Sequence, residues 1–293
     1  MDPNKLGYAH EIILKQYLPD IANLEIRHDD VFVISYPKSG TTWTLHIVCQ
    51  IFKEDRNNTD KSIFEEIPYL EFPQGHDLAA IDTIPGQYEL LDIMSSPRVI
   101  KSHLKPHNLP RDMKVKAPKV IYVARNPKDT AVSAYNFCKL LPGFPTLEEW
   151  PDFFEHFCKG TGPRGSWFEH VLTYWKQSRN DPNKLFLKFE DMKKDLKGAV
   201  STISEFLERS LSEASLDLIV NNSTFSAMRS NPKTNPDLNP GELNKIPAQF
   251  FRKGKVGDWK NYFTVAQNES FDVLYTEKLR GSDLTFEFEP SHL

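Results

Sequence analysis

The chain has 293 residues, of which 39% are hydrophobic and 26% charged, so it can bury a sizeable core as one large domain or two small ones. A net charge of −4 argues against a general nucleic-acid binder, because such proteins carry a basic excess. Cys49, Cys138 and Cys158 have no metal-type spacing and cannot form a closed disulfide set. Free thiols in a reducing compartment are the simplest interpretation.

The N-terminal stretch, residues 1–25, has no basic region followed by a continuous apolar run, so no signal peptide is predicted. No apolar run approaches the roughly 20 residues that a membrane-spanning helix needs. We therefore expect a cytoplasmic protein with neither a membrane nor a nucleic-acid partner.

Three short apolar runs predict buried strands, because each is too short for a helix and rich in β-branched or aromatic residues. They are residues 31–35 (VFVIS), 119–124 (KVIYVA) and 184–189 (KLFLKF), with a weaker run at 98–102 (RVIKS). Helical patterns alternate with them at 41–52, 128–140, 166–178 and 192–207. The alternation predicts an α/β fold, a parallel sheet covered by helices on both faces. In such sheets ligands bind just after the strands.

The first strand leads into the loop YPKSGTTW, residues 36–43. Gly40 lets backbone N–H groups approach an anion closely, and Lys38 adds a positive charge. Thr41 and Thr42 stand at a helix start, where free N–H groups and the helix dipole favour phosphate. The pattern predicts a P-loop-like phosphate site, although the lysine precedes the glycine. An ordinary strand-to-helix turn is the alternative.

The weaker run ends in the sequence KSH, in which His103 follows Lys101 by two residues. A histidine at a strand end is a candidate general base near neutral pH. The alternative is a structural histidine, which is the commoner role of a lone histidine.

Two further cationic sites are predicted. Arg125, directly after a strand, can bind a phosphate with its planar guanidinium, and Ser133 on the next helix can reach the same group. The alternative is an arginine paired with Asp129 or Glu190. The segment FRKGK, residues 251–255, is either a phosphate clamp or a solvated charge run.

The Pro-rich segment 231–247 predicts a lid or binding loop, since long irregular segments in compact domains are usually functional. No acidic residue is placed to hold Mg²⁺ as phosphoryl transfer requires, so no metal is predicted.

These motifs together resemble the cytosolic sulfotransferases, which move a sulfuryl group from 3′-phosphoadenosine 5′-phosphosulfate (PAPS) to an acceptor. The matching segments are YPKSGTTW, KSHL, YVARNPKD, STFSAM and FRKGKVGDWK, in the family's order and spacing. Because the resemblance covers nearly the whole chain, residues 1–293 are expected to form one sulfotransferase domain.

The resemblance implies a set of nucleotide contacts. The 5′-phosphosulfate would be bound by Lys38, Ser39, Gly40, Thr41, Thr42 and Trp43. The 3′-phosphate would be bound by Arg125, Ser133, Arg252, Lys253 and Gly254. Adenine and nearby atoms would be contacted by Trp43, Phe189, Ser223, Thr224, Phe225, Met228 and Phe251. The family often has tyrosine at the position of Phe189, and phenylalanine there is similar to its amine sulfotransferase branch.

The resemblance also implies catalytic roles without a metal. His103 would take the acceptor proton, Lys38 would stabilise the leaving oxygen, and Lys101 and Ser133 would assist. In-line transfer needs such a base and stabilisation of the developing charge. The product, adenosine 3′,5′-bisphosphate, is strongly anionic, which accounts for two cationic sites.

The acceptor is expected to be a small, largely apolar phenol, alcohol, steroid or arylamine, as in phase II conjugation of xenobiotics. Its pocket would be formed by Tyr69, Phe72, Lys101, Ser102, His103 and Phe137, with a contribution from Phe144. A lining rich in aromatic residues suits a flat or elongated apolar ligand.

Residues 260–269 match the family's short dimer motif, K-x-x-x-T-V-x-x-x-E, and predict a homodimer with a small interface. A helix-capping turn is the alternative. Two other functions remain open on the residues alone: a nucleotide kinase, suggested by the phosphate loop, and a binder that has lost transfer activity.

Overall fold

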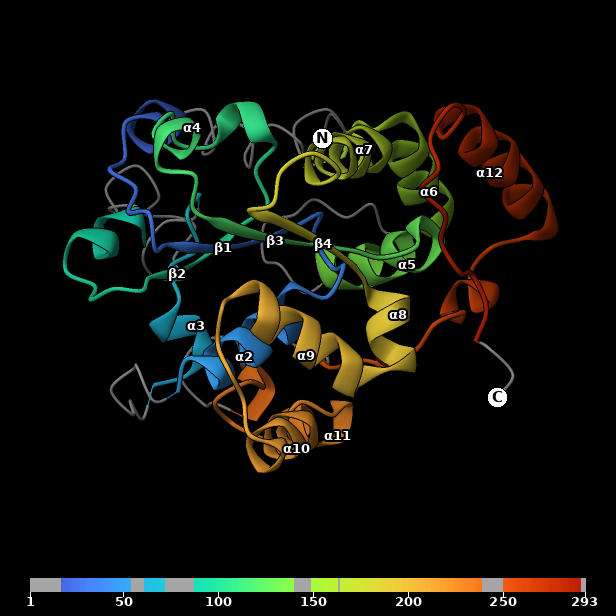
Figure 1. The fold of residues 1–293 in the computed structure, drawn as a ribbon. Coiled ribbons are helices and arrows are strands. Elements are labelled where there is room, and N and C mark those ends of the chain that lie inside the picture. The colour runs from blue at the N-terminus through green and yellow to red at the C-terminus, as the bar shows by residue number, and fades with distance from the viewer. Residues whose placement is uncertain are drawn as a thin grey trace.

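The centre of the molecule is a parallel sheet. The computed structural model describes residues 17–53, 61–71, 87–139, 149–162, 164–238 and 250–290. In this part of the chain the strands are β1 (Val31–Ser35), β2 (Val99–Ser102), β3 (Lys119–Ala124) and β4 (Lys184–Lys188). Their order is β2-β1-β3-β4, and all three pairings are parallel (Figure 1). The predicted bounds of β1 and β3 are confirmed.

Helices cover both faces of the sheet, because side chains alternate along each strand. Val31 and Val33 of β1 pack in a core with α2 (Thr41–Ile51), α9 (Leu196–Phe206) and α10 (Glu213–Asn222). Phe32 and Ile34 pack in a second core with α5 (Pro127–Cys138), α6 (Trp150–Lys159), α7 (Trp167–Ser178) and α12 (Val265–Lys278). Figure 1 shows α6 and α7 on one side of the sheet and α2, α9 and α10 on the other. The predicted α/β fold class is confirmed.

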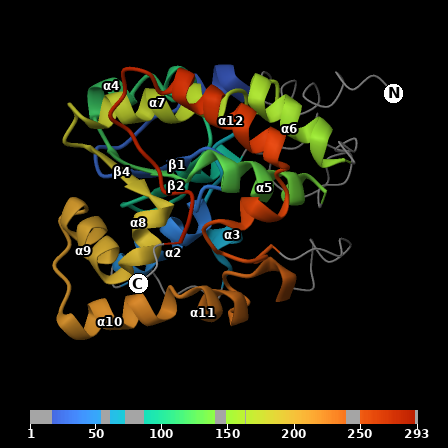
Figure 2. The ribbon, with the colours of Figure 1, turned by 90° about the vertical axis from the view of Figure 1, so that its right-hand side faces the viewer.

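Shorter elements connect these layers. The short α-helices are α3 (Ile63–Glu66), α4 (Met113–Lys116), α8 (Phe189–Lys194) and α11 (Phe225–Ser230). The 3₁₀ helices are η2 (Gln87–Asp92), η3 (Pro106–Asn108), η4 (Pro236–Leu238) and η5 (Asp258–Asn261). After α12 the chain runs back past β4 towards α8 (Figure 2), where Glu287 forms an ion pair with Lys194.

The prediction of one helix over 192–207 was wrong. Asp195 interrupts it with a non-helical backbone, and its carboxylate accepts a hydrogen bond from the Gly198 N–H at 2.8 Å, so it caps a new helix, α9. The predicted strand 184–189 is one residue shorter, since Phe189 begins α8. Each residue of β4 is half-exposed, because this strand lies at the edge of the sheet.

The parallel register brings the carboxyl ends of the strands to one edge. Val31 of β1 lies opposite Val99 of β2 and Lys119 of β3. The residues that follow the strands, among them His103 and Arg125, therefore share that edge. None of the described helices is long and apolar enough to cross a membrane. The three cysteines are half-buried free thiols.

Candidate active site

The loop after β1 is shaped by two residues in the left-handed backbone region. Lys38 has φ 69° and Gly40 has φ 111°. A Cβ on Gly40 would lie 3.1 Å from the Phe189 ring, so both the conformation and the space favour glycine. Gly40 is also the N-cap of α2 and has no side chain to cap the first-turn N–H groups. This favours an anion site over an ordinary capped turn.

Lys38 lies between aromatic rings and among other cations. Its Nζ is 4.2 Å from the centroid of the Phe137 ring and 4.6 Å from that of Phe250. Burial, followed by the charges of Lys101 and Arg125, lowers the pKa of Lys38 to about 7. The negative charge of an anion bound at this loop would favour the protonated form of Lys38 and so offset this shift.

His103, after β2, is held in one tautomer by the end of β1. Its Nδ1 lies 2.7 Å from the Ser35 carbonyl oxygen and 3.2 Å from the Ser35 hydroxyl. Because a carbonyl oxygen only accepts, Nδ1 carries the proton and Nε2 has the free lone pair. Burial and the charge of Lys101 hold the pKa of His103 well below its usual value, so the imidazole is neutral. This arrangement suits a general base.

Two buried residues that sequence reasoning missed hold the His103 backbone. Glu71 accepts hydrogen bonds from the His103 N–H at 2.6 Å and the Ser102 hydroxyl at 2.9 Å. His170 on α7 donates from Nε2 to the His103 carbonyl at 3.1 Å. A lone acid in an aromatic segment and a helical histidine carry no motif, so the sequence held no signal for either. Ser102, predicted at the acceptor, is wholly buried and bonded to Glu71.

Aromatic and basic side chains surround His103. The Tyr69 ring meets the His103 imidazole edge-on, with centroids 5.3 Å apart. The Nζ of Lys101 lies 4.0 Å from the Tyr69 ring centroid, and Arg164 donates to the Tyr69 hydroxyl at 3.0 Å. Phe137 reaches the same region through its contact with Lys38. Two predicted acceptor residues lie outside the described residues, Phe72 and Phe144.

Arg125, after β3, is a second buried cation near the loop. Its Nη2 donates to the Lys255 carbonyl at 2.8 Å, and its guanidinium lies 4.5 Å from the Phe189 ring centroid. Asp129 is 3.8 Å away, too far for a direct hydrogen bond, and Glu190 bonds Asn126. Burial lowers the pKa of Arg125. Arg125 is therefore not tightly paired with either Asp129 or Glu190.

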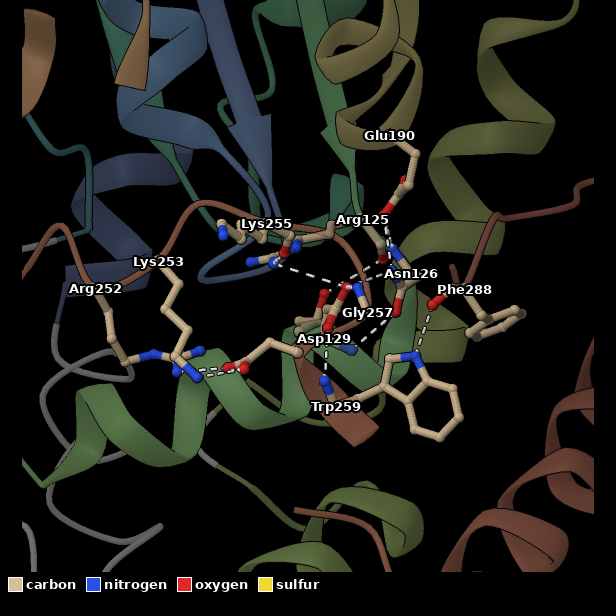
Figure 3. Close-up of polar contacts among 12 residues, drawn as sticks. Arg125, Asn126, Asp129, Glu190, Arg252, Lys253, Lys255, Gly257, Trp259 and Phe288 are labelled. Atoms are coloured by element: carbon tan, nitrogen blue, oxygen red, sulfur yellow. Dashed lines mark hydrogen bonds and ion pairs between the residues drawn. The ribbon is translucent and has the colours of Figure 1, made fainter. Parts of the chain in front are cut away.

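The segment 251–255 is held by ion pairs and by the packing of its glycine, although Lys253 and Lys255 are exposed to solvent. Arg252 and Lys253 each lie 2.5 Å from an oxygen of Asp258, which is 4% exposed (Figure 3). Gly254 has φ 59°, and a Cβ there would lie 2.3 Å from the Phe225 ring, so only glycine fits. These contacts place the segment against α11.

An aromatic group joins the two cationic regions. Trp43 packs edge-on against Phe189 with centroids 5.3 Å apart, and its indole N–H donates to the Ser223 carbonyl at 2.7 Å. The rings of Phe225 and Phe251 lie 5.7 Å apart. Three more residues were predicted to contact the nucleotide. Met228 is buried, Thr224 is the N-cap of α11, and Ser133 on α5 is half-buried.

Three buried hydrogen-bond donors at this site fit a polar ligand. Among the buried side-chain atoms of the described residues that have no hydrogen-bond partner are Ser39 Oγ, Arg125 Nε and Ser223 Oγ. Buried polar atoms in native proteins are normally paired, so each is an unused contact for a bound group. They occur at the loop, the second cationic region and the aromatic group, which fits one anionic nucleotide. The described residues form no group of three or more acidic, His or Cys side chains suited to a metal.

Comparison with known proteins identifies the family. A family model described as a sulfotransferase domain matches residues 28–283. Human sulfotransferase 1E1 is 40% identical over 292 residues, covering 97% of each chain. Mouse sulfotransferase 1A1 is 40% identical over 274 residues, covering 92% of this chain and 91% of that protein. The chain belongs to the sulfotransferase family. This membership confirms the predicted enzyme class, a PAPS-dependent sulfotransferase.

Solved structures agree with the fold of this sulfotransferase. Mouse sulfotransferase SULT7A1, complexed with PAP, is 34% identical with a TM-score of 0.73, covering 93% of this chain and 91% of that one. Retinol dehydratase in a complex with retinol and PAP is 28% identical with a TM-score of 0.82, covering 94% and 88%.

Proposed function

We propose that this sulfotransferase transfers the sulfuryl group of PAPS to a hydroxyl or amine of a small apolar acceptor, with His103 as general base. The observation that carries the proposal is the Nδ1–H bond to the Ser35 carbonyl at 2.7 Å. It leaves Nε2 of a neutral imidazole to accept the acceptor's proton, at the sheet edge that also bears the phosphate loop. PAPS, when bound, supplies the sulfuryl group.

Two cationic regions would divide the nucleotide between them. Lys38 and the first-turn N–H groups of α2 would hold the 5′-phosphosulfate, and Lys38 would stabilise the departing oxygen. Arg125 and the 251–255 segment would hold the 3′-phosphate. The PAP-bound structures of SULT7A1 and retinol dehydratase support a nucleotide of this kind. Trp43, against Phe189 and Ser223, would border the adenine.

The acceptor would lie against Tyr69 and Phe137, beside His103 and Lys101. An aromatic lining with few polar groups favours flat or elongated apolar molecules. Retinol dehydratase, a structural neighbour, has been solved with retinol and with androsterone, both elongated and apolar. Phenols, alcohols, steroids and arylamines are the classes to test.

We also propose a cytoplasmic homodimer that uses residues 260–269. Val265 is 76% exposed at the start of α12, and Thr264 caps that helix by accepting the Gln267 N–H at 3.1 Å. Residues 260–269 therefore do contain a helix cap, but capping by Thr264 does not explain why the apolar side chain of Val265 is exposed. Sedimentation of the wild-type chain and Val265→Glu tests this: a concentration-dependent dimer lost in the variant supports it, and two identical monomers contradict it.

The function is tested by assaying sulfate transfer from radiolabelled PAPS to a panel of phenols, alcohols, steroids and arylamines. We expect turnover with at least one class and formation of adenosine 3′,5′-bisphosphate in equal amount. Binding of that product by calorimetry, without turnover of any acceptor, would indicate a binder instead. Neither binding nor turnover would contradict the proposal.

A further inference from the structure

Asp129 on α5 is a buried acid at the edge of the second cationic region. Its side chain is 1% exposed and accepts three hydrogen bonds. The donors are the Gly257 N–H at 2.8 Å and Asn126 Nδ2 at 2.9 Å to Oδ2, and the Trp259 N–H at 3.0 Å to Oδ1 (Figure 3). Two of them belong to a segment 128 and 130 residues away in the sequence.

These bonds connect the two parts of the cationic region. Gly257 and Trp259 directly follow the segment 251–255, and the Lys255 carbonyl accepts from Arg125 at 2.8 Å. The segment is thus attached to the start of α5 on both sides of Val256. Trp259 is fixed further by its indole N–H, which donates to the Phe288 carbonyl at 2.7 Å. Arg252 is linked to these contacts through its ion pair with Asp258, which lies between Gly257 and Trp259 in the sequence.

Glu190 on α8 supports the same contacts from behind. Its Oε1 accepts from the Asn126 N–H at 2.8 Å and from Asn126 Nδ2 at 3.0 Å. Asn126 Oδ1 in turn accepts the Asp129 N–H at 2.8 Å. Burial raises the pKa of Glu190 to about 7, so this acid carries less negative charge than an ordinary glutamate. The chain Glu190–Asn126–Asp129 therefore joins α8, α5 and the later segment.

An acid beside an anion site would normally weaken anion binding. Here the charge of Asp129 is taken up by backbone and amide N–H groups, which are fixed and buried. Arg125 lies 3.8 Å from Asp129 and keeps its buried Nε without a partner among the described residues. The carboxylate of Asp129 is therefore bound by backbone and amide N–H groups, and the Nε of Arg125 remains available to a ligand.

We infer that Asp129 is a positioning residue that holds residues 251–259 against Arg125 and so sets the geometry of the 3′-phosphate site. The inference rests on the proposed nucleotide function. Asp129 does not touch the phosphate; it acts through the backbone of Gly257 and Trp259. Affinity for the nucleotide depends on it, and the chemistry at His103 does not.

The test uses Asp129→Asn in the full chain, which preserves shape and loses the negative charge. In the variant, the side-chain oxygen at position 129 can still accept a hydrogen bond. The NH₂ group of the new amide replaces the other carboxylate oxygen and faces an N–H donor, so that bond is lost. Because hydrogen bonds to charged groups are strong, we expect affinity for adenosine 3′,5′-bisphosphate to fall about 10- to 100-fold. Turnover at saturating PAPS and the acceptor KM should stay within about twofold. Amide hydrogen exchange should speed up at Gly257 and Trp259.

A control and a double-mutant cycle separate positioning from general destabilisation. Asp272 is another acid bonded to α5, because its Oδ1 lies 2.5 Å from the Nζ of Lys128. The control variant Asp272→Asn should leave nucleotide affinity unchanged. In an Arg252→Ala background, Asp129→Asn should add less than in the wild type, because both act on one contact. If Asp129→Asn does not fold, Asn126→Ala removes the amide that orients the Asp129 carboxylate and should lower nucleotide affinity in the same direction, by a smaller factor and with turnover unchanged.

The outcomes are distinct. Unchanged nucleotide affinity in Asp129→Asn, or fully additive losses with Arg252→Ala, would overturn the inference and leave the function intact. A wild-type chain that does not bind adenosine 3′,5′-bisphosphate would contradict the proposed function itself.

Discussion

The region around His103 and the region around Arg125 are built in different ways. The region of the base is carried by neighbouring strand ends: His103 follows β2 and is held by the Ser35 carbonyl at the end of β1. The region of Arg125 is assembled from segments far apart in the chain, since the Lys255 carbonyl that Arg125 contacts lies 130 residues away. A sheet edge is rigid, which suits reacting groups that must be aligned. The assembled region is proposed to set nucleotide affinity, which tolerates more adjustment of its groups than alignment of a reacting group does.

The largest expected effect comes from breaking the base region. His103→Ala should lower turnover about 100- to 10,000-fold, the usual contribution of general base catalysis. Affinity for adenosine 3′,5′-bisphosphate should change little, because His103 contacts the β1 end and not the phosphate groups. Steady-state rates and calorimetry measure the two effects. His107→Ala, an exposed histidine four residues on, is the control. Near-normal turnover of His103→Ala would refute the base assignment.

The second-largest loss of turnover is expected at Lys38, which belongs to the phosphate loop. Lys38→Met should lower turnover about 100- to 1,000-fold, as removal of a charge-stabilising donor does. The exposed Lys116→Met is the matched control. Turnover of Lys38→Met equal to that of the control would show that the loop lysine does not act on the leaving oxygen.

Lys38 should also make nucleotide binding depend on pH. Its pKa is about 7 in the free protein, and a bound anion favours the charged form, which raises that pKa. Binding above pH 7 therefore takes up a proton, and affinity should fall between pH 7 and 9, by less than about tenfold per unit. Calorimetry in two buffers of different ionisation enthalpy measures the uptake. Lys101, with a pKa of about 8, accounts for what remains in Lys38→Met. The same dependence in both proteins would contradict the assignment.

The smallest expected effect comes from the assembled region. Arg252→Ala should weaken adenosine 3′,5′-bisphosphate binding about 10- to 100-fold, the value of a hydrogen bond between charged groups. Turnover at saturating PAPS should be nearly unchanged. The loss is limited because Arg125 remains and because Arg252 is paired with Asp258 in the free protein. Arg280→Ala removes an exposed cation elsewhere and should have no effect. Equal affinity in the two variants would exclude Arg252 from the phosphate site.

Much of the fold was readable from local pattern. The apolar runs predicted β1 and β3 to the residue, and the alternation of strands and helices predicted the parallel sheet. Errors occurred where one side chain decided the backbone, as at Asp195, whose carboxylate starts a new helix. From the amphipathic pattern alone, one cannot tell whether an aspartate caps a new helix or lies on the solvent-exposed face of a continuous one.

The shared location of Lys38, His103 and Arg125 was also predictable, because each stands in a motif directly after a strand. The residues that hold them were not. Glu71 binds a backbone 32 residues away, and Asp129 binds one 128 residues away. Their partners are N–H groups, which every residue except proline has, so no side-chain pattern marks the contact.

By itself, the sequence determined which candidate groups gather at one edge of the sheet, since strand ends in a parallel sheet share that edge and the motifs follow those ends. Only the tertiary structure decided how those groups are held and charged. The tautomer of His103 depends on the Ser35 carbonyl, and the placement of the 251–255 segment depends on the Asp129 carboxylate. Burial and long-range hydrogen bonds set both, and neither exists until the chain has folded.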